Sequence, residues 1–264
     1  MKDKNVVERP NDEREFKNWL KSELGFEINN QYAYYYETVV QKLKKDFEES
    51  AFWKELLNNL PEINDKYRVN KGVYLLIPTN TPTILSKSLD SLVNKAYRKN
   101  ILNNDQFPDP PRSGWITPEN WFRNTNDIIR TSLTVKYLDG VAFIISELEE
   151  LSFQYGYDFD SSFEAREEGY YAAHSGIKIP FSIPDMQFSP EDITLNIEIQ
   201  VTTQIQEIIK TLLHKHYEEN RRVIIPEDYK WQWDYQSPEF TSNYLGHIIH
   251  YVEGMIVEIR DREE

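Results

Sequence analysis

Apolar residues recur at helical spacing through the first quarter of the chain. One amphipathic stretch is formed by Phe16, Trp19, Leu20 and Leu24. A second stretch, rich in tyrosine, places its apolar and aromatic positions on one face: Tyr32, Tyr35, Tyr36, Val39, Val40, Leu43 and Phe47. This pattern predicts helices over residues 1 to about 70, with the tyrosine-rich face used mainly for packing.

The pattern changes near residue 73. A short apolar segment, residues 72–78, is closed by prolines and threonines, and residues 86–100 form a basic amphipathic pattern. The inward face of that helix is predicted to carry Leu89, Leu92, Val93 and Ala96. Residues 103–120 are rich in Pro, Asn and Asp and predict a loop long enough to suggest a functional role.

Strands and helices then alternate along the chain. Residues 127–138 predict a strand, 141–151 a helix and 171–183 an extended segment. The clearest strand is 194–201, where Leu195, Ile197, Ile199 and Val201 share one face. A helix over about 203–220 and a Trp- and Tyr-rich connector over 229–235 follow. The last predicted helix carries Leu245, Ile248, Ile249, Val252, Met255, Ile256 and Ile259. Interleaving of this kind indicates an α+β or α/β protein.

Charge and composition narrow the functional classes. The chain holds 30 basic and 44 acidic residues, a net charge of −14, which argues against binding nucleic acid or anionic membrane through the net field. The absence of cysteine excludes disulfides, thiolate zinc sites and a cysteine nucleophile. No long apolar run and no hydrophobic leader segment are present in the sequence, so we expect a cytoplasmic protein without a membrane partner.

The nine glycines exclude the common nucleotide loops. Their spacing matches neither the Walker A loop nor the dinucleotide-binding motif, and His-Glu-x-x-His and Gly-x-Ser-x-Gly are also absent. If the protein handles a nucleotide, charged side chains must therefore hold its phosphates.

Two carboxylates are candidates for such a site. Asp127, near the start of one predicted strand, and Glu198, on the polar face of another, could share a divalent cation, and Mg²⁺ suits all-oxygen sites that include phosphate. Basic residues of the 86–100 helix could neutralise a polyphosphate: Lys87, Lys95, Arg98 and Lys99. Segment 163–174 adds tyrosines that could stack a nucleobase. Taken singly, each of these features is more often solvated surface or packing.

Taken in order, however, three segments resemble the synthetase domain of the RelA/SpoT family, the alarmone synthetases. DIIRTSLTV at 127–135 resembles the strand with the metal-binding aspartate. AREEGYYAAH at 165–174 is similar to Pro-Lys-x-x-Gly-Tyr-Arg-Ser-Leu-His, and EIQVTT at 198–203 is similar to Glu-Ile-Gln-Ile-Arg-Thr. SKSLDSLVNK at 86–95 more loosely resembles the ATP-gripping run of the family.

The resemblance implies an α+β fold, a nucleotidyltransferase-like mixed sheet flanked by helices, over about residues 84–220. It implies three regions: an N-terminal helical region (1–72), a synthetase domain (73–225) and a connector with a C-terminal helix (226–264). The implied reaction moves the β,γ-pyrophosphate of ATP to a ribose 3′-hydroxyl. The partners would be ATP, Mg²⁺ and a purine acceptor.

Residue roles carry over from the matching motif positions. Asp127 and Glu198 would be catalytic and hold Mg²⁺, with Glu198 also taking the proton of the attacking hydroxyl. Tyr170 would stack the acceptor base. The acceptor would further contact His174, Gln200 and Arg166, and ATP would be held by Lys87, Ser91, Lys95 and Arg98.

The chain also departs from the family pattern. Leu85 stands where the ATP-stacking arginine is expected, and Arg130 and Ser132 replace a Gly-x-Arg. Tyr171 and Thr202 each stand at arginine positions of the acceptor motifs. No histidine occurs in residues 1–70, so an upstream metal-dependent hydrolase domain is not expected.

These departures make the chain most similar to the toxic small alarmone synthetases, which work in toxin–antitoxin pairs. Several of them pyrophosphorylate the 3′-terminal adenosine of tRNA and thereby inhibit translation, which would imply a separate antitoxin protein. Synthesis of (p)ppGpp or (p)ppApp from free nucleotides is the alternative, and a relative that binds without turnover is a third. The net charge of −14 opposes tRNA docking except on local basic patches.

Overall fold

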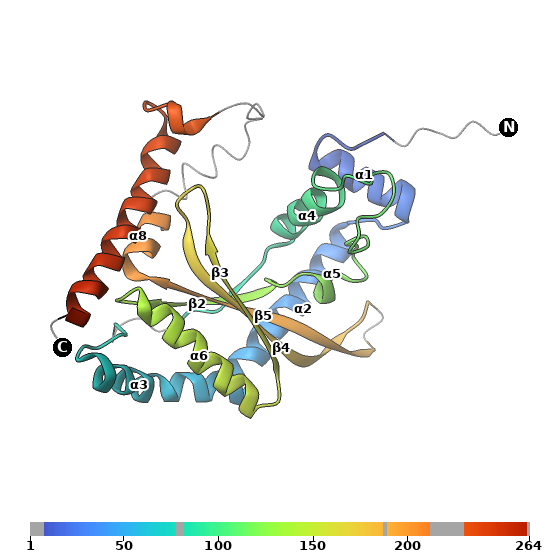
Figure 1. The fold of residues 1–264 in the computed structure, drawn as a ribbon. Helices are drawn as coiled ribbons and strands as arrows, with labels where there is room; N and C mark the ends of the chain where they lie inside the picture. Colours follow the sequence, from blue (N-terminus) through green and yellow to red (C-terminus); the bar gives the residue numbers. More distant parts are fainter. Residues whose placement is uncertain (1–7, 78–81, 187–188, 212–229, 263–264) are drawn as a thin grey trace. The chain divides into compact units, whose positions relative to one another are not determined.

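The computed structural model describes residues 8–77, 82–186, 189–211 and 230–262 (Figure 1). Three helices come first: α1 (Glu13–Leu24), α2 (Asn30–Glu49) and α3 (Ala51–Lys71). The middle of the chain contains β1 (Leu85–Ser86), α4 (Leu89–Tyr97), the π-helix η1 (Arg98–Leu102), α5 (Trp121–Asn124), β2 (Ile129–Val135) and α6 (Asp139–Gln154). The remaining elements are β3 (Asp158–Ala165), β4 (Tyr171–Pro184), β5 (Pro190–Thr203), η2 (Trp231–Trp233) and α8 (Pro238–Arg262).

The five strands form one mixed sheet in the order β1-β2-β5-β4-β3. β1 pairs with β2 in antiparallel register, with Leu85 opposite Arg130. A short turn joins β3 to β4 and is closed by a backbone hydrogen bond of 3.0 Å from Arg166 N to Tyr170 O. Between the end of β4 and the start of β5, Asp185 N donates to Ser189 O at 2.8 Å. The predicted α+β class, with a mixed sheet and flanking helices, is confirmed.

The chain divides into two compact units. The first comprises residues 1–48, 85–130 and 178–197, and the second comprises 49–84, 131–177 and 198–264, so the division falls inside β2, β4 and β5. In the first unit α1 packs against α4 (Figure 1). Its core is aromatic: Phe16, Tyr36 and Trp121 are fully buried, and the ring of Tyr36 stacks on Phe122 with centroids 5.7 Å apart.

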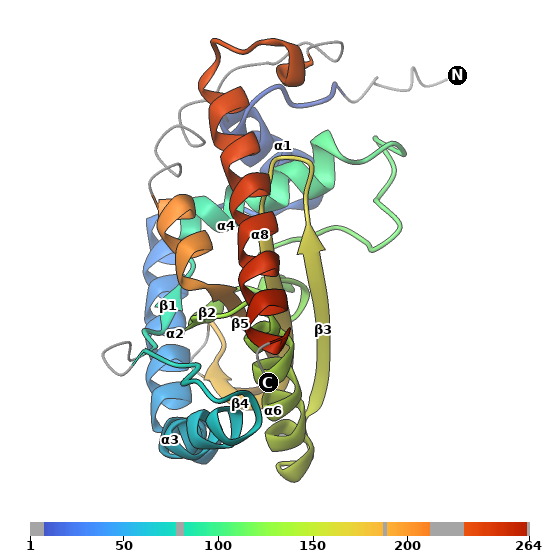
Figure 2. The same ribbon diagram turned by 60° about the vertical axis from the view of Figure 1, so that its left-hand side comes forward.

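In the second unit α6 packs against both α3 and β3 (Figure 1). The predicted apolar segment after α3 forms a single bridge from Leu76 to Val135 of β2. A polar cluster joins three helices: Arg260 of α8 contacts Asp139 at 2.8 Å and the hydroxyl of Tyr67 at 2.9 Å. Figures 1 and 2 both show α8 passing beside the turn between β3 and β4.

Most predicted elements are present. The predicted strand 194–201 lies within β5, where odd-numbered residues are buried and Asn196, Glu198 and Gln200 are half-buried. The predicted helix 203–220 is described only over 204–211, and the rest of it lies outside the described residues. β3 was not predicted as a strand. No described helix is long and apolar enough to cross the membrane.

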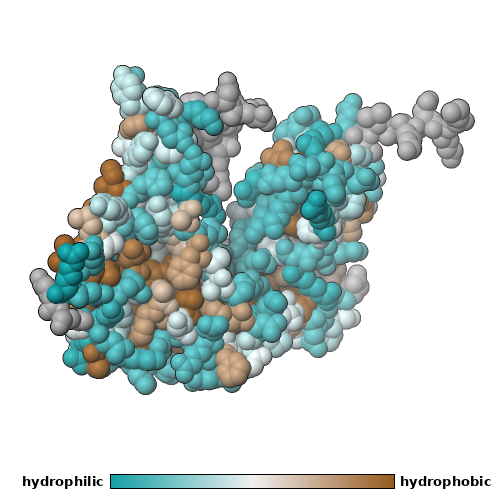
Figure 3. All heavy atoms as spheres, in the orientation of Figure 1, coloured by the Kyte–Doolittle hydropathy of each residue, from teal (hydrophilic) through white to brown (hydrophobic). Residues whose placement is uncertain are grey.

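The last helix is confirmed, but its apolar side chains point mainly outward. Ile248, Ile256 and Ile259 are 56%, 43% and 55% exposed, whereas Gly246 and Glu253 are buried. Figure 3 shows hydrophobic side chains along the surface of α8. Neither carboxylate oxygen of Glu253 has a hydrogen-bond partner in the described part of the chain.

Candidate active site

Asp127 lies at the centre of a charged cluster in the first unit. Its two carboxylate oxygens accept hydrogen bonds from Lys87 Nζ at 2.6 Å and Lys95 Nζ at 2.8 Å. Lys87 is held where the β1 segment meets the chain before β2, because its backbone N donates to Ile128 O at 2.9 Å. Lys95 lies in the last turn of α4, whose N-cap is Ser88. The three side chains are largely buried, so their charges interact more strongly than on an open surface.

Burial and the neighbouring charges shift the pKa values of this cluster in opposite directions. Burial raises the pKa of Asp127, but hydrogen bonds from Lys87 and Lys95 outweigh it and hold the pKa below its usual value. Burial also lowers the pKa of Lys87, and Asp127 only partly offsets this effect. Asp127 is therefore ionised at neutral pH and lies between two ammonium groups that could contact phosphate.

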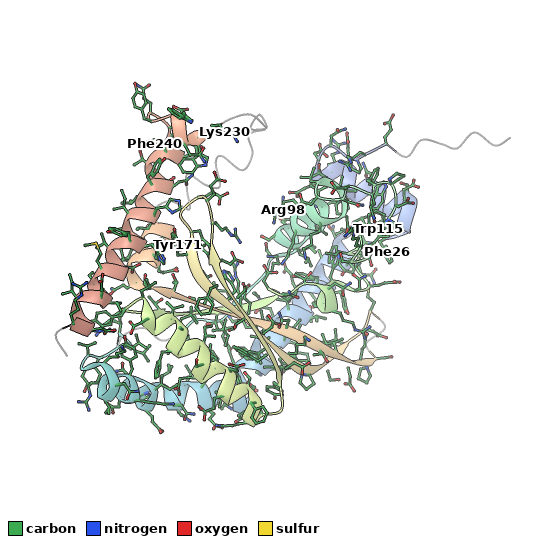
Figure 4. The ribbon with its side chains drawn as sticks, viewed as in Figure 1. Phe26, Arg98, Trp115, Tyr171, Lys230 and Phe240 are labelled. Carbon is green, nitrogen blue, oxygen red and sulfur yellow. The ribbon has the colours of Figure 1, made fainter. Side chains whose placement is uncertain are left out.

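The other predicted ATP residues lie on the same stretch of chain. Ser91 donates its backbone N to Ser88 Oγ at 3.3 Å, and the two hydroxyls are 2.9 Å apart in the first turn of α4. Arg98 begins η1 and is exposed (Figure 4). Leu85, at the expected position of the stacking arginine, is half-exposed in β1. Lys87 and Lys95 thus meet at Asp127, while Ser91 and Arg98 lie outside that cluster.

A second cluster, in the second unit, joins four predicted residues through hydrogen bonds. Gln200 Nε2 donates to the hydroxyl of Tyr170, which lies 3.0 Å from His174 Nε2. His174 Nδ1 lies 2.5 Å from Glu198 Oε1. If Nδ1 carries the proton, every contact is satisfied: Tyr170 donates to Nε2, and Nδ1–H donates to the carboxylate. The series brings together β5 and the start of β4, which are distant in sequence.

Arg166 also joins this cluster. Its guanidinium lies 5.2 Å from the centre of the Tyr170 ring and pairs with Glu164 at 2.5 Å. Burial raises the pKa of Tyr170, and the negative charge of Glu164 adds to this effect, so the phenol is neutral at physiological pH. At the Gln200 end of the hydrogen-bonded series, Lys210 Nζ lies 3.4 Å from Gln200 Oε1.

The carboxylate oxygens of Asp127 and Glu198 are chemically suitable ligands for Mg²⁺. Carboxylate oxygens are its preferred protein ligands, and Mg²⁺ commonly uses one or two of them together with substrate phosphates. Among the described residues, no group of three or more His, Asp and Glu side chains could hold a metal without such help. Asp127 belongs to the first unit and Glu198 to the second, so their joint binding of Mg²⁺ stays a prediction.

Sequence reasoning missed a set of contacts beside the second cluster. The hydroxyl of Tyr171 lies 2.7 Å from His247 Nδ1, and its ring stacks on His250 with centroids 3.6 Å apart (Figure 4). In the sequence, His247 and His250 show only a spacing of three residues on a predicted helix, which does not indicate what they contact. Tyr171 is 76 residues from His247 in the sequence, and no local pattern indicates this contact.

Comparisons with known proteins add evidence on the fold. No protein-family model and no curated protein sequence matches the chain. Among solved structures, small alarmone synthetase 1 from Bacillus subtilis superposes with a TM-score of 0.52 at 17% identity, covering 88% of this chain and 95% of that one.

Two further structures are similar to the same degree. Small alarmone synthetase 1 from Bacillus subtilis bound to its product pppGpp gives a TM-score of 0.52 at 18% identity, covering 88% of this chain and 96% of that one. The protein smu.1046c from Streptococcus mutans UA159 gives 0.51 at 18% identity, with coverage of 86% and 93%. The chain therefore has the fold of the small alarmone synthetases.

Proposed function

We propose that the chain is an ATP-dependent pyrophosphokinase. The ribose 3′-oxygen of an acceptor attacks the β-phosphorus of ATP, the bond from that phosphorus to the α,β-bridging oxygen breaks, and AMP leaves. The observation that carries the proposal is the series Gln200–Tyr170–His174–Glu198. It gathers, in one hydrogen-bonded set, the residues that the sequence resemblance assigns to the acceptor and the base.

The Asp127 cluster supports a role in binding ATP. Lys87 and Lys95 offer two ammonium groups, which could neutralise phosphates without a glycine loop. We propose that Ser91 and Arg98 add contacts to the nucleotide from the same stretch of chain. Asp127 and Glu198 are the residues that would hold Mg²⁺, which when bound would supply positive charge for the transferred phosphates.

The acceptor would be recognised by the second cluster. Tyr170 would stack the purine, with its hydroxyl fixed by Gln200 and His174, and Arg166 would add a positive charge near the same ring. Glu198 would take the proton of the 3′-hydroxyl. His174, which bonds to that carboxylate, would orient it for this role.

For the acceptor itself, we propose the 3′-terminal adenosine of tRNA. Tyr171 and Thr202 stand where the resemblance expects arginines, which supports an acceptor pocket changed from that for free guanosine nucleotides. Such transfer would prevent aminoacylation and inhibit translation, and the chain would then act as a toxin that requires a separate antitoxin protein.

Free nucleotides are the second candidate. The net charge of −14 disfavours a polyanionic acceptor, and a small nucleotide needs no basic surface. The similar synthetase from Bacillus subtilis has been solved with pppGpp as its product. On this alternative the chain would make (p)ppGpp or (p)ppApp.

Transfer of label separates these candidates. The protein is incubated with γ-labelled ATP and Mg²⁺, and with deacylated tRNA, GDP, GTP or AMP in turn. We expect labelled tRNA, and we expect Asp127→Asn and Glu198→Gln to lower the rate at least 100-fold. Glu37→Gln, on the exposed face of α2, is the matched control. Label only in small nucleotides would support the alternative, and no label in any acceptor would refute pyrophosphate transfer.

A further inference from the structure

The turn at residues 166–170, between β3 and β4, is packed closely against α8. A Cβ atom placed on Gly246 would come within 2.2 Å of the carbonyl oxygen of Gly169. A Cβ placed on Gly169, whose φ is +75°, would come within 2.3 Å of the carbonyl oxygen of Asn243. Both residues must therefore be glycine for the two backbones to touch, and the contact lies directly beside Tyr170.

His247, the next residue of α8, bonds to both sides of this turn. Its Nε2 lies 2.9 Å from Glu167 O, and its Nδ1 lies 2.7 Å from the Tyr171 hydroxyl. A carbonyl can only accept, so Nε2 carries the proton, and in the neutral ring Nδ1 accepts from the tyrosine. One imidazole thus ties Glu167, within the turn, to Tyr171, the first residue of β4.

Further contacts surround this junction of α8 with the turn. The ring of Tyr171 lies parallel to that of His250, with 3° between their planes. Gln206 Nε2 donates to Gly246 O at 3.3 Å, which links α8 to the helix that follows β5. The side chain of Gln232 in η2 donates to the carboxylate of Glu167. Figure 2 shows α8 beside the turn, and Figure 4 shows Tyr171 between the sheet and α8.

From these contacts we infer that α8 braces the 166–170 turn and that His247 is the positioning residue that fixes Tyr170 for acceptor binding. The role of Tyr170 in this inference rests on the function proposed above. The brace itself rests on the contacts of Gly246, His247 and His250. Because His247 does not contact the hydrogen-bonded series directly, it acts through Tyr171, the immediate neighbour of Tyr170.

Two glycines of the same helix provide a matched test. Gly246→Ala places a methyl group into the backbone of the turn and should push α8 away from it. Gly254→Ala, two turns later, meets nothing nearer than Leu138 Cδ2 at 3.9 Å, an ordinary contact. Both changes favour the helix equally through propensity, so a difference between them reports the contact with the turn.

The kinetic readout separates positioning from general damage. We expect Gly246→Ala and His247→Ala to raise the KM for the acceptor about tenfold while the KM for ATP changes less than twofold. Gly254→Ala should match the wild type. His247→Gln, which keeps a donor for Glu167 O, should recover part of the loss. Tyr171→Phe should add little to His247→Ala, because both remove the same bond.

Hydrogen exchange of residues 165–172 makes the test independent of catalysis. Faster exchange in Gly246→Ala and His247→Ala than in Gly254→Ala is expected. Wild-type exchange in both, or an equal rise in the KM for ATP and for acceptor, would overturn the inference. If the wild type transfers to no acceptor, the proposed function fails, and the exchange data alone decide whether α8 braces the turn.

Discussion

At the scale of single residues, Asp127 carries the clearest electrostatic consequence. Asp127→Asn leaves Lys87 and Lys95 facing a neutral amide, and we expect it to lower the free energy of unfolding by about 2–4 kcal/mol at pH 7. The pKa of the folded carboxyl lies below its usual 3.8, so its contribution is present above that value and is lost as pH falls through the lower folded pKa.

Urea unfolding at pH 7, 5 and 3 measures this effect. The difference between wild type and Asp127→Asn should be the same at pH 7 and 5 and smaller at pH 3. Glu37→Gln should show no comparable difference at any of the three. If the difference in free energy of unfolding between wild type and Asp127→Asn stayed constant down to pH 3, Asp127 would not be the stabilising carboxylate.

The pH dependence of stability that we expect from Glu253 is opposite to that expected from Asp127. Burial raises the pKa of Glu253 above the usual 4.5, and the polar side chains of Thr203 and Gln206 offset this only in part. As pH rises above about 4.5 the unfolded carboxyl ionises before the folded one, so wild-type stability decreases. Glu253→Gln should therefore stabilise the protein by about 1 kcal/mol at pH 7 and by nothing at pH 4. If chemical unfolding gave the same stability change for Glu253→Gln at both pH values, Glu253 could not be a buried carboxyl with a raised pKa.

Motif matching in the sequence identified most of these polar residues but not their partners. The sequence motifs indicate five of them: Asp127, Tyr170, His174, Glu198 and Gln200. That Lys87 and Lys95 would both bond to one carboxylate depends on how the chain before β2 lies against α4. The bond from Tyr171 to His247 depends on the docking of α8, which no spacing in the sequence encodes.

At the scale of elements, the anchoring of α8 makes a prediction. Arg260 is largely buried, and it joins the end of α8 to Asp139 at the start of α6 and to Tyr67 of α3. Arg260→Met keeps an apolar side chain of similar reach but leaves Asp139 and the Tyr67 hydroxyl without the guanidinium. We expect a loss of about 2–3 kcal/mol in thermal or urea unfolding.

The same helix offers a matched control for this change. Arg262 pairs with Glu258 at a spacing of four residues, and both side chains are well exposed. Arg262→Met should cost less than about 0.5 kcal/mol. If the two substitutions were equally harmful, the cluster of Arg260, Asp139 and Tyr67 would not be what anchors the helix.

A strand with one buried face, such as β5, could be predicted from its sequence pattern. A mostly exposed strand, such as β3, could not. β5 alternates buried and half-buried residues, so its period of two is visible in the sequence. β3 is an edge strand, is exposed along most of its length and offers only Phe159 and Phe163 as large apolar side chains. The apolar spacing of α8 predicted a helix, but not that its buried face would centre on Gly246 and Glu253.

At the scale of the whole molecule, charge bears on the choice of acceptor. A chain of net charge −14 can bind tRNA only through local basic residues, and such contacts release counterions from the RNA. With about three phosphate contacts, the KM for tRNA should rise about twentyfold to fortyfold between 50 and 200 mM salt. The KM for ATP should change much less and serves as the control. A flat salt response with tRNA would argue against tRNA as the acceptor.

The stoichiometry of ATP cleavage tests the central claim most directly. The β- and γ-phosphates must leave together, so each molecule of pyrophosphorylated acceptor should appear with one molecule of AMP. Mass spectrometry of the acceptor and chromatography of the adenine nucleotides measure both. The account predicts equal amounts of AMP and of acceptor heavier by two phosphates. ADP in place of AMP, or inorganic pyrophosphate with an unchanged acceptor, would contradict it.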